Sequence, residues 1–473
     1  MLDDKIKETF PNESVIKLSD NYSVFAGTNL PSFIKDFLIK RYSNAEGHLD
    51  KAGVLRFISE HIPSKHNDFR SRLRTNKEEV TVLARIIIET DLKNDKTLFS
   101  IPDLEIKSSE GRIPDYVIRK HQELKRDGEL WGVVTLGYEP PNGRERGYVQ
   151  LLNYKPFKPY QISFEYLRKV RSKYSIIEWV DLLIRAMEYN PDAFESMSQK
   201  LMFLSRLLVF VEPRLNMIEL APKGTGKSYV FGQLSKYGWL ISGGIVSRAK
   251  LFYDMQKKSM GIIRLYDFIS MDEIQTIRFS DPDELKAALK TYLEQGYTNI
   301  MGVRVESMAG VMLMGNIPLN NRNQPISAKY FTELPDIFKE SALLDRFHGF
   351  IEGWNLPRIT EDLKVNGYTL NVEYFSEILH ELRSAPEYAV AVNDLLDIPT
   401  KADTRDTTAV KRLATAYLKI LFPNVTDASE IDKQDFKVFC LDPAMEKRRI
   451  IREQISLIDD EFSPTMPSIK IKD

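Results

Sequence analysis

The spacing of hydrophobic residues along the chain changes its period several times. Over residues 30–62 apolar side chains recur every three or four positions, which predicts amphipathic helices. Residues 77–92 carry a denser, β-branched run that fits a helix or a strand, and we leave both open. Within residues 130–157 such runs flank the turn sequence Pro140–Gly143, which predicts a β-hairpin. The proline-containing stretch Lys155–Pro159 then predicts a linker.

The second half of the chain has the pattern of an α/β fold. Helical spacing returns over residues 163–209, and from Asn216 onward short apolar runs alternate with amphipathic segments. This alternation is typical of a parallel sheet covered by helices. We therefore expect a mixed α+β N-terminal module with a helical part and a hairpin part, an α/β core, and a helical lid with a C-terminal tail. The predicted boundaries are 1–158, 159–355 and 356–473.

Composition narrows the class of protein without deciding its function. The 473 residues are 43% hydrophobic and 28% charged, as in ordinary folded proteins of several domains. A formal net charge of −1 means that any affinity for nucleic acid must come from local basic surfaces. The single cysteine, Cys440, cannot form an internal disulfide and fits a reducing cytoplasm. We expect neither export nor membrane insertion, because no apolar run is long enough for a signal peptide or a membrane span.

A phosphate-binding loop is the strongest motif in the chain. The apolar run 216–220 is followed by a loop and then by a helical segment, and the loop consists of Ala221, Pro222, Lys223, Gly224, Thr225, Gly226, Lys227 and Ser228. Strand, glycine-containing loop and helix are the order that a phosphate cradle requires, because backbone N–H groups must point at the phosphate oxygens. Lys227 would contact the β- and γ-phosphates of ATP, and Ser228 would bind Mg²⁺. Ala221 stands where the usual loop pattern has glycine, which is tolerated if its φ stays negative.

Two further strand ends carry polar groups that ATP hydrolysis needs. The apolar run Ile262–Met271 ends in Asp272 and Glu273. Asp272 would hold the Mg²⁺, and Glu273 would orient and polarise the attacking water. The run Gly310–Gly315 ends in Asn316, whose amide fits a hydrogen bond to the water or the γ-phosphate, or else a turn.

The order of these elements resembles the AAA+ core, with Asn316 at the sensor-1 position. Arg346 matches the arginine finger of the MCM replicative helicases, a residue that reaches the γ-phosphate in the neighbouring subunit. Arg405 precedes a helix as the MCM-type sensor-2 arginine does, and a surface salt bridge is the alternative for either arginine. The segment Ile300–Glu306 resembles the pre-sensor-1 hairpin of MCM and Lon-related proteins, where Arg304 would touch a translocated strand. An ordinary edge hairpin fits the same residues.

The chain as a whole resembles the BrxL family, the AAA+ proteins of BREX bacteriophage-defence systems. The resemblance implies a cytoplasmic, ring-forming ATPase with ATP and Mg²⁺ as cofactors, which binds DNA and translocates on it. It also implies a homo-oligomer, expected to be a hexamer, with room for stacking into a double ring and for other BREX proteins as partners. Many relatives carry a C-terminal protease-type domain, yet no Gly-Pro-Ser-Ala loop with a following lysine occurs here. We expect no protease activity from these residues, whether the chain is short by nature or truncated.

Clusters of basic residues, most of them in the N-terminal module, give partial support to the prediction that the chain binds DNA. Side chains of this kind give phosphate contacts without base readout, although each cluster fits a solvated surface equally well. The candidates are Arg70, Arg72, Arg74 and Lys77, with Lys65 and His66 beside them, Arg144 and Arg146 at the predicted hairpin tip, and Arg304. Two other functions stay open. One is a protein unfoldase, although Trp239–Gly244 fits a strand better than a pore loop, and the other is a scaffold that loads on DNA without translocating.

Overall fold

The computed structural model describes residues 2–28, 30–44, 46–62, 69–91, 94–125, 128–143, 145–256 and 258–472. The chain forms two compact units. The sheet unit comprises Met1–Ser19, Asn29–Phe37 and Tyr160–Asp473, and the barrel unit comprises Asp20–Thr28 and Leu38–Pro159.

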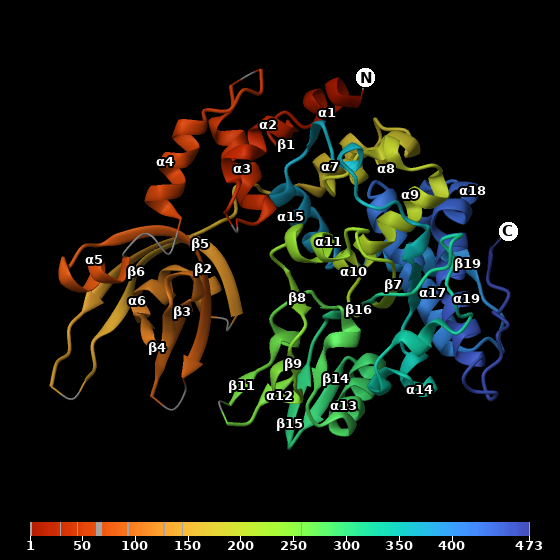
Figure 1. The fold of residues 1–473 in the computed structure, drawn as a ribbon. Helices are drawn as coiled ribbons and strands as arrows, with labels where there is room; N and C mark the ends of the chain where they lie inside the picture. Colours follow the sequence, from red (N-terminus) through yellow and green to blue (C-terminus); the bar gives the residue numbers. More distant parts are fainter. Residues whose placement is uncertain are drawn as a thin grey trace. The chain divides into compact units, whose positions relative to one another are not determined.

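The barrel unit is built around a closed barrel in the strand order β2-β3-β4-β6-β5 (Figure 1). β4 and β6 run parallel, and every other neighbouring pair is antiparallel. Its strands are β2 (Val80–Asp91), β3 (Lys96–Ile101), β4 (Ile106–Ile113), β5 (Gly128–Glu139) and β6 (Tyr148–Pro156). Its helices include α4 (Lys51–His61), α5 (Phe69–Thr75) and α6 (Asp115–Lys120), and α6 connects β4 to β5.

Within residues 77–92, which fit a helix or a strand by sequence, Val80–Asp91 forms β2. Val82, Ala84, Ile86 and Ile88 are all buried in the barrel core. Side chains two positions apart share a face only in a strand, and the β-branched residues of this run favour extended backbone. The buried face of β2 therefore decides the conformation that local sequence leaves open.

The hairpin predicted within residues 130–157 is confirmed, and its second strand is longer than predicted. β5 and β6 pair in an antiparallel register from Gly132 opposite Pro156 to Glu139 opposite Tyr148. Phe157 is buried, and its N–H donates to the carbonyl of Trp131 at 2.8 Å. The predicted linker at Lys155–Pro159 is therefore corrected, because its first three residues belong to the barrel.

The sheet unit contains a five-stranded parallel sheet in the order β17-β7-β16-β12-β8, which confirms the predicted α/β class (Figure 1). Every residue of the three central strands is buried, as expected for a parallel sheet covered on both faces. The strands are β7 (Asn216–Leu220), β8 (Gly238–Ser242), β12 (Phe268–Asp272), β16 (Gly310–Gly315) and β17 (Gly349–Glu352). The helices include α7 (Phe164–Arg171), α8 (Ile176–Ala186), α11 (Lys227–Gln233), α13 (Pro282–Gln295), α15 (Val372–Leu382), α17 (Thr404–Leu421) and α19 (Asp442–Ser456).

The strand predicted for Ile262–Met271 is shorter than its apolar run. Only Phe268–Asp272 is extended, whereas Ile262–Arg264 forms a turn of 3₁₀ helix. A Cβ on Gly261 would lie 2.3 Å from the carbonyl carbon of Leu251, so the backbone passes another segment closely there. Ile263 is buried in the same core as the strand, which explains why hydrophobicity alone merges the two segments.

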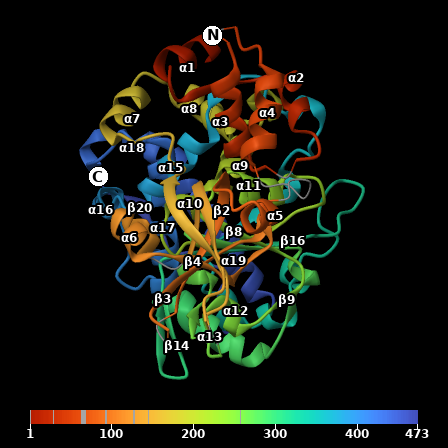
Figure 2. The same ribbon diagram turned by 90° about the vertical axis from the view of Figure 1, so that its left-hand side faces the viewer.

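The first residues of the chain pack with the sheet unit, whereas the sequence placed them in a module ending at residue 158. β1 (Ser14–Lys17) pairs antiparallel with β18 (Gly367–Leu370). α1 (Leu2–Thr9) lies beside α8, with Lys5 Nζ 2.7 Å from a carboxylate oxygen of Glu178 (Figure 2). These contacts join segments far apart in sequence, so no local pattern reports them.

Helices after residue 356, predicted as a lid, belong to the same compact unit as the sheet. α19 packs against the edge strand β17. No helix within the described ranges combines the length and the apolar composition that crossing a bilayer requires.

Candidate functional site

Three strand ends meet at the carboxyl edge of the parallel sheet. β16 lies between β7 and β12, so the residues that follow these three strands are neighbours. The chain passes from β7 to the far strand β8 and later crosses from β16 over β7 to β17. Open parallel sheets bind ligands at the carboxyl ends of strands where the winding direction reverses, and here that point lies between β7 and β16.

The phosphate-binding loop follows β7 and has the backbone that phosphate binding requires. Gly224 and Gly226 have φ of +83° and +78°, a region that favours glycine. A Cβ on Gly226 would lie 2.1 Å from Tyr189 Oη, so no larger residue fits. Ala221 is absent from the described residues with positive φ, and its N–H donates to the carbonyl of Gly315 at 3.1 Å. Alanine is therefore compatible with the first loop position.

Lys227 begins helix α11 and points its ammonium back into the loop. Its Nζ donates to the carbonyl oxygen of Ala221 at 3.0 Å and lies 3.4 Å from that of Pro222. The residue is 7% exposed, and burial lowers the pKa of its ammonium. A buried cation that contacts two loop carbonyls can also bind the oxygens of a phosphate chain.

Ser228 and Asp272 come together as the sequence predicts for a magnesium site. Ser228 Oγ donates to Asp272 Oδ2, and Asp272 is 4% exposed at the end of β12. A hydroxyl and a carboxylate are the hard oxygen ligands that Mg²⁺ prefers, so the two side chains fit that ion.

Glu273 and Asn316 flank this pair. Glu273 is exposed and has φ of +47°, a left-handed conformation that costs a non-glycine residue about 1 kcal/mol or more. Gln275 Nε2 donates to the carbonyl of Asn316 at 2.7 Å, and its Oε1 lies 3.3 Å from the Asn316 nitrogen. The Gln275 side chain thus connects the segment after β12 to the end of β16. The left-handed backbone at Glu273 changes the direction of the chain directly after β12.

A cavity of about 650 Å³ opens beside these strand ends. Its lining includes Lys223, Gln275, Asn316, Glu333 and Arg358. Neither Lys223 nor Arg358 has a hydrogen-bond or ion-pair partner among the residues that the structure describes. Sequence analysis missed Arg358, and its position shortly after the buried strand β17 was the available indication.

A buried ion pair below the loop was also missed. Arg206 is fully buried and donates to both carboxylate oxygens of Glu219 at 2.6 and 3.0 Å. Its third contact is the carbonyl of Thr225 at 2.8 Å, inside the phosphate-binding loop. Glu219 lies between Ile218 and Leu220 in a buried strand, and this was the signal in the sequence, since such a glutamate needs a buried partner.

Arg346 and Arg405 lie together at the opposite edge of the sheet. Arg346 precedes β17, and the next residue but one, His348, donates its N–H to the carbonyl of Asn216 at the start of β7. Glu294 on α13 faces both arginines, 2.9 Å from Arg346 Nε and 3.3 Å from an Arg405 nitrogen. One strand of five residues, about 16 Å, separates this edge from the phosphate-binding loop.

A fully buried arginine, Arg448, supports this cluster from α19. It contacts the carboxylates of Asp345 at 2.5 Å and Asp406 at 2.7 Å, and donates to the carbonyl of Phe347 at 2.8 Å. Arg405 binds the other carboxylate oxygen of Asp345 at 2.8 Å. The two predicted arginines are therefore fixed by acidic side chains of their own chain.

The hairpin predicted around Arg304 is confirmed as β14 (Tyr297–Ile300) and β15 (Val303–Glu306). Met301 and Gly302 both have positive φ, as a two-residue hairpin turn requires. The Arg304 side chain is 56% exposed and lies 3.8 Å from the centre of the Tyr297 ring. It also forms a 3.3 Å ion pair with Glu306, so part of its charge is balanced within the hairpin.

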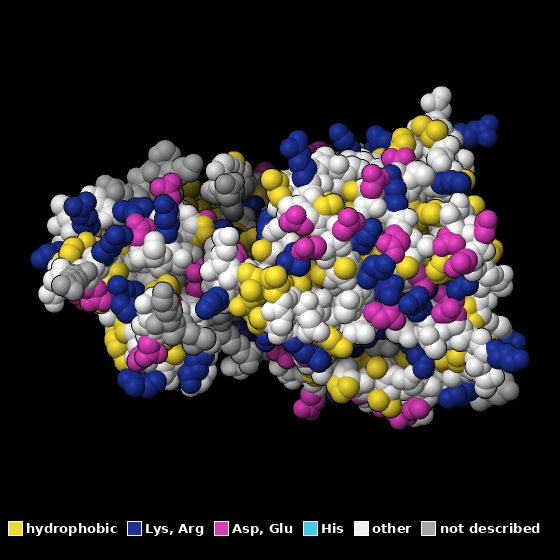
Figure 3. Space-filling model, turned by 90° about the horizontal axis from the view of Figure 1, so that it is seen from below, with side chains coloured by type: hydrophobic (Ala, Val, Ile, Leu, Met, Phe, Trp, Pro, Cys, Tyr) yellow, Lys and Arg dark blue, Asp and Glu magenta, His cyan; other side chains and the backbone are white. Residues whose placement is uncertain are grey.

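The basic cluster of the barrel unit is partly neutralised. Arg70 pairs with Glu110 at 2.9 Å and Arg72 with Glu78 at 2.8 Å. Arg74, Lys77 and Arg146 are exposed. Acidic side chains lie among the basic ones on the face of this unit seen in Figure 3. Lys65, His66 and Arg144 lie outside the described residues.

Comparison with known proteins identifies the family. The model "Lon-like protease BrxL-like, ATPase domain" matches residues 149–468, and "BREX system Lon protease-like protein BrxL N-terminal" matches residues 8–138. The chain belongs to the BrxL family. Its ATPase-domain match contains the phosphate-binding loop, the Ser228–Asp272 pair and Asn316.

Three known proteins are similar in sequence to this chain. It is 26% identical to "Lon-like protease BrxL" of Escherichia coli O9:H4 (strain HS), covering 91% of this chain and 61% of the relative. It is 25% identical to "Lon-like protease BrxL" of Bacillus cereus (strain H3081.97), covering 91% and 63%. "Uncharacterized protein ORF426" of Acidianus filamentous virus 1 is 25% identical, covering 53% and 65%. The chain thus spans about three fifths of the length of the two BrxL relatives.

Proposed function

We propose that the chain is a ring-forming AAA+ ATPase that binds DNA and translocates on it in BREX phage defence. The observation that carries the proposal is the meeting of Lys227, the Ser228–Asp272 pair and Asn316 at one edge of the sheet. The family to which the chain belongs supports an ATPase and a role in BREX. Cytoplasmic action, a hexameric ring that stacks in pairs, and other BREX proteins as partners complete the proposal.

ATP hydrolysis follows from the roles that these positions allow. Lys227 and the loop N–H groups bind the β- and γ-phosphates, and Ser228 and Asp272 are the residues that would hold Mg²⁺. Bound Mg²⁺ would neutralise charge on the phosphates. Glu273 accepts a proton from water as the water oxygen attacks the γ-phosphorus, and the bond to the β-phosphate oxygen breaks to leave ADP and phosphate. Asn316 donates an amide hydrogen bond to the water or to the γ-phosphate.

In this proposal each ATP site receives arginines from two subunits, its own and a neighbouring one. Arg358 lines the cavity beside the loop of its own subunit and contacts phosphate there. Arg346 and Arg405 lie about one strand length from their own loop, so they serve the site of a neighbouring subunit. A head-to-tail interface of this kind generates a closed ring.

Substitution of Glu273 by Gln tests the chemistry directly. The variant keeps the shape and hydrogen-bonding capacity of the side chain but loses the base, so ATP binding should persist while turnover stops. Turnover at the parental rate would show that the water is activated elsewhere. The matched control is Glu333→Gln, which removes a carboxylate from the wall of the adjoining cavity and should leave most of the turnover intact.

DNA binding is tested against the unfoldase and scaffold alternatives. Two unrelated duplexes should bind with similar affinity, and the affinity should fall steeply with salt because phosphate contacts release counterions. DNA should stimulate ATP hydrolysis. Stimulation by an unfolded protein alone would favour the unfoldase, and DNA binding without strand displacement or movement would favour the scaffold.

A further inference from the structure

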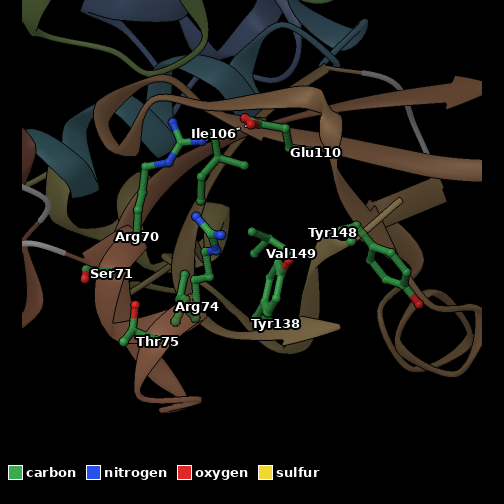
Figure 4. A pocket seen from close by; sticks show the side chains of 11 residues that line it. Arg70, Ser71, Arg74, Thr75, Ile106, Glu110, Tyr138, Tyr148 and Val149 are labelled. Carbon is green, nitrogen blue, oxygen red and sulfur yellow. Dashed lines mark hydrogen bonds and ion pairs between the residues drawn. The ribbon is translucent and has the colours of Figure 1, made fainter. Parts of the chain in front are cut away.

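A second cavity, of about 600 Å³, opens in the barrel unit (Figure 4). Helix α5 contributes Arg70, Ser71, Leu73, Arg74 and Thr75, and the barrel strands and the turn before β6 contribute Ile106, Glu110, Tyr138, Gly147, Tyr148 and Val149. In Figure 4 the Arg74 guanidinium extends between Arg70 and Tyr138.

The cavity lies beside the strand pair of the closed barrel that shares the fewest paired positions. β4 and β6 share a parallel register only at Gly111 opposite Val149 and Arg112 opposite Gln150. Gly147 lies next to this opening, and a Cβ there would come within 2.4 Å of Tyr138 Oη. The missing side chain therefore lets Tyr138 lie in the cavity wall, where a larger residue would displace it.

The charged groups of the cavity differ in their freedom to bind a ligand. Arg70 is held by the carbonyl of Glu105 at 2.9 Å and by Glu110 at 2.9 Å. Arg74 is exposed, and it has no hydrogen-bond or ion-pair partner within the described ranges. The Tyr148 ring is covered by the Arg112 guanidinium at 4.0 Å from its centre. Arg74 and Tyr138 are therefore the cation and the aromatic ring available to a ligand.

We propose that this cavity binds one unstacked nucleotide of a single-stranded nucleic acid. Arg74 contacts the phosphate, and the base packs against the Tyr138 ring. Base-on-aromatic stacking combined with a basic groove is the general mode of single-strand binding, and it needs bases that are free of a helix. A duplex keeps its bases stacked inside and offers only phosphates at its surface, so it cannot fill a cavity of this size. The inference rests on the proposed DNA function and specifies the form of the strand.

The test measures binding of the full chain to a fluorescein-labelled oligothymidylate and to a labelled duplex by fluorescence anisotropy. Arg74→Ala should weaken binding of the single strand by about tenfold and binding of the duplex by less than about threefold. Arg72→Ala is the matched control: it removes the same charge from the same helix but lies outside the cavity lining, and it should affect both probes equally. Tyr138→Ala should weaken the single strand about tenfold, and Tyr138→Phe should restore it.

Three outcomes separate the inference from the function on which it rests. Equal effects of Arg74→Ala and Arg72→Ala on both probes, or no effect of Tyr138→Ala, would overturn the cavity assignment while leaving DNA binding intact. Binding of a fluorescein-labelled thymidine monophosphate that Arg74→Ala weakens, together with effects of Arg74→Ala on the strand no larger than those of Arg72→Ala, would overturn it in favour of a free nucleotide. Failure of the parent chain to bind either probe would overturn the proposed DNA function itself. Thermal unfolding and the far-UV circular dichroism spectrum of each variant control for its fold.

Discussion

The two edges of the parallel sheet hold their cations in different ways. At the carboxyl edge, Lys223 and Arg358 line a cavity and form no ion pair with any residue that the structure describes, and the Lys227 ammonium contacts two backbone carbonyls. At the opposite edge, Arg346 and Arg405 are paired with the carboxylates of Glu294 and Asp345. In the proposed function, Arg358 contacts phosphate within its own subunit, and the cavity wall positions its side chain without an ion pair. Arg346 and Arg405 are proposed to reach a neighbouring subunit, and acidic side chains of their own chain hold them in place.

The largest expected effect is at the carboxyl edge. Lys227→Ala removes the buried ammonium that closes the loop, so nucleotide affinity should collapse and ATP turnover should fall to background. Binding of a fluorescent ATP analogue and phosphate release measure the two quantities. Retained affinity would mean that the cavity near Arg358, and not the loop, dominates nucleotide binding.

Substitution of either buried arginine, Arg206 or Arg448, should lower stability, but the two substitutions should affect ATP binding differently. Arg206→Ala leaves the buried Glu219 carboxylate without its arginine and should lower the free energy of unfolding by about 3–5 kcal/mol in denaturant titrations. Arg448→Ala should lower it by less, because Arg405 still binds Asp345 and Arg452 still binds Asp406. Arg206→Ala should also weaken ATP binding, because Arg206 holds the carbonyl of Thr225. Arg448→Ala should spare ATP binding by isolated subunits and reduce only the turnover of the assembled protein. The reverse pattern would contradict the assignment of the two edges.

Substitution of Arg358, which is exposed, and of Arg346, which is half-buried, sharpens the same comparison. Arg358→Ala should raise the KM for ATP several-fold at every protein concentration, because it acts within its own subunit. Arg346→Ala should leave ATP affinity unchanged and lower kcat by about 10²-fold or more, the magnitude typical of an arginine finger. Arg358→Lys should restore part of the affinity. Equal effects of both substitutions on affinity would remove the distinction between the edges.

The smallest effect concerns a carboxylate cluster before β8, at the same edge as Arg346. Glu373 and Glu377 share the single ammonium of Lys236, and burial raises the pKa of Glu373 from 4.5 to about 7. The folded state therefore keeps a proton that the unfolded chain releases above about pH 4.5. Stability from this group is greatest below that pH and should fall by roughly 1–3 kcal/mol as the pH rises to about 7. Glu373→Gln should flatten this part of the unfolding profile, and an unchanged slope would contradict the shift.

The sequence predicted the parts of the site that local order determines. The strand, loop and helix around Lys227 are consecutive, and each of Asp272 and Asn316 follows an apolar run, so parallel strand ends bring them together. The hairpin carrying Arg304 follows from the alternation of side chains over Ile300–Glu306. These inferences need only the period of the chain and the geometry of a parallel sheet.

The remaining features depend on contacts between distant segments. Arg206 meets Glu219 and Thr225 only after folding, and only its place shortly after the strand β17 distinguishes Arg358 from other surface arginines. The apolar run at 262–271 has the composition of one long strand, but the close backbone approach at Gly261 splits it. The sequence placed the N-terminal residues in the first module, whereas in the structure β1 pairs with a strand of the sheet unit about 350 positions later. Contacts between such distant segments cannot be predicted from local sequence patterns.

The most direct test of the division between the two edges mixes two inactive variants. Lys227→Ala subunits retain Arg346 but lack a working loop, and Arg346→Ala subunits have the loop but lack the finger. If Arg346 serves a neighbouring subunit, equal mixing should restore ATP turnover to about a quarter of the parental rate, because a quarter of random interfaces pair an intact loop with an intact finger. If Arg346 acts within its own subunit, no mixed site is complete, and turnover will stay at the level of the separate variants at every mixing ratio.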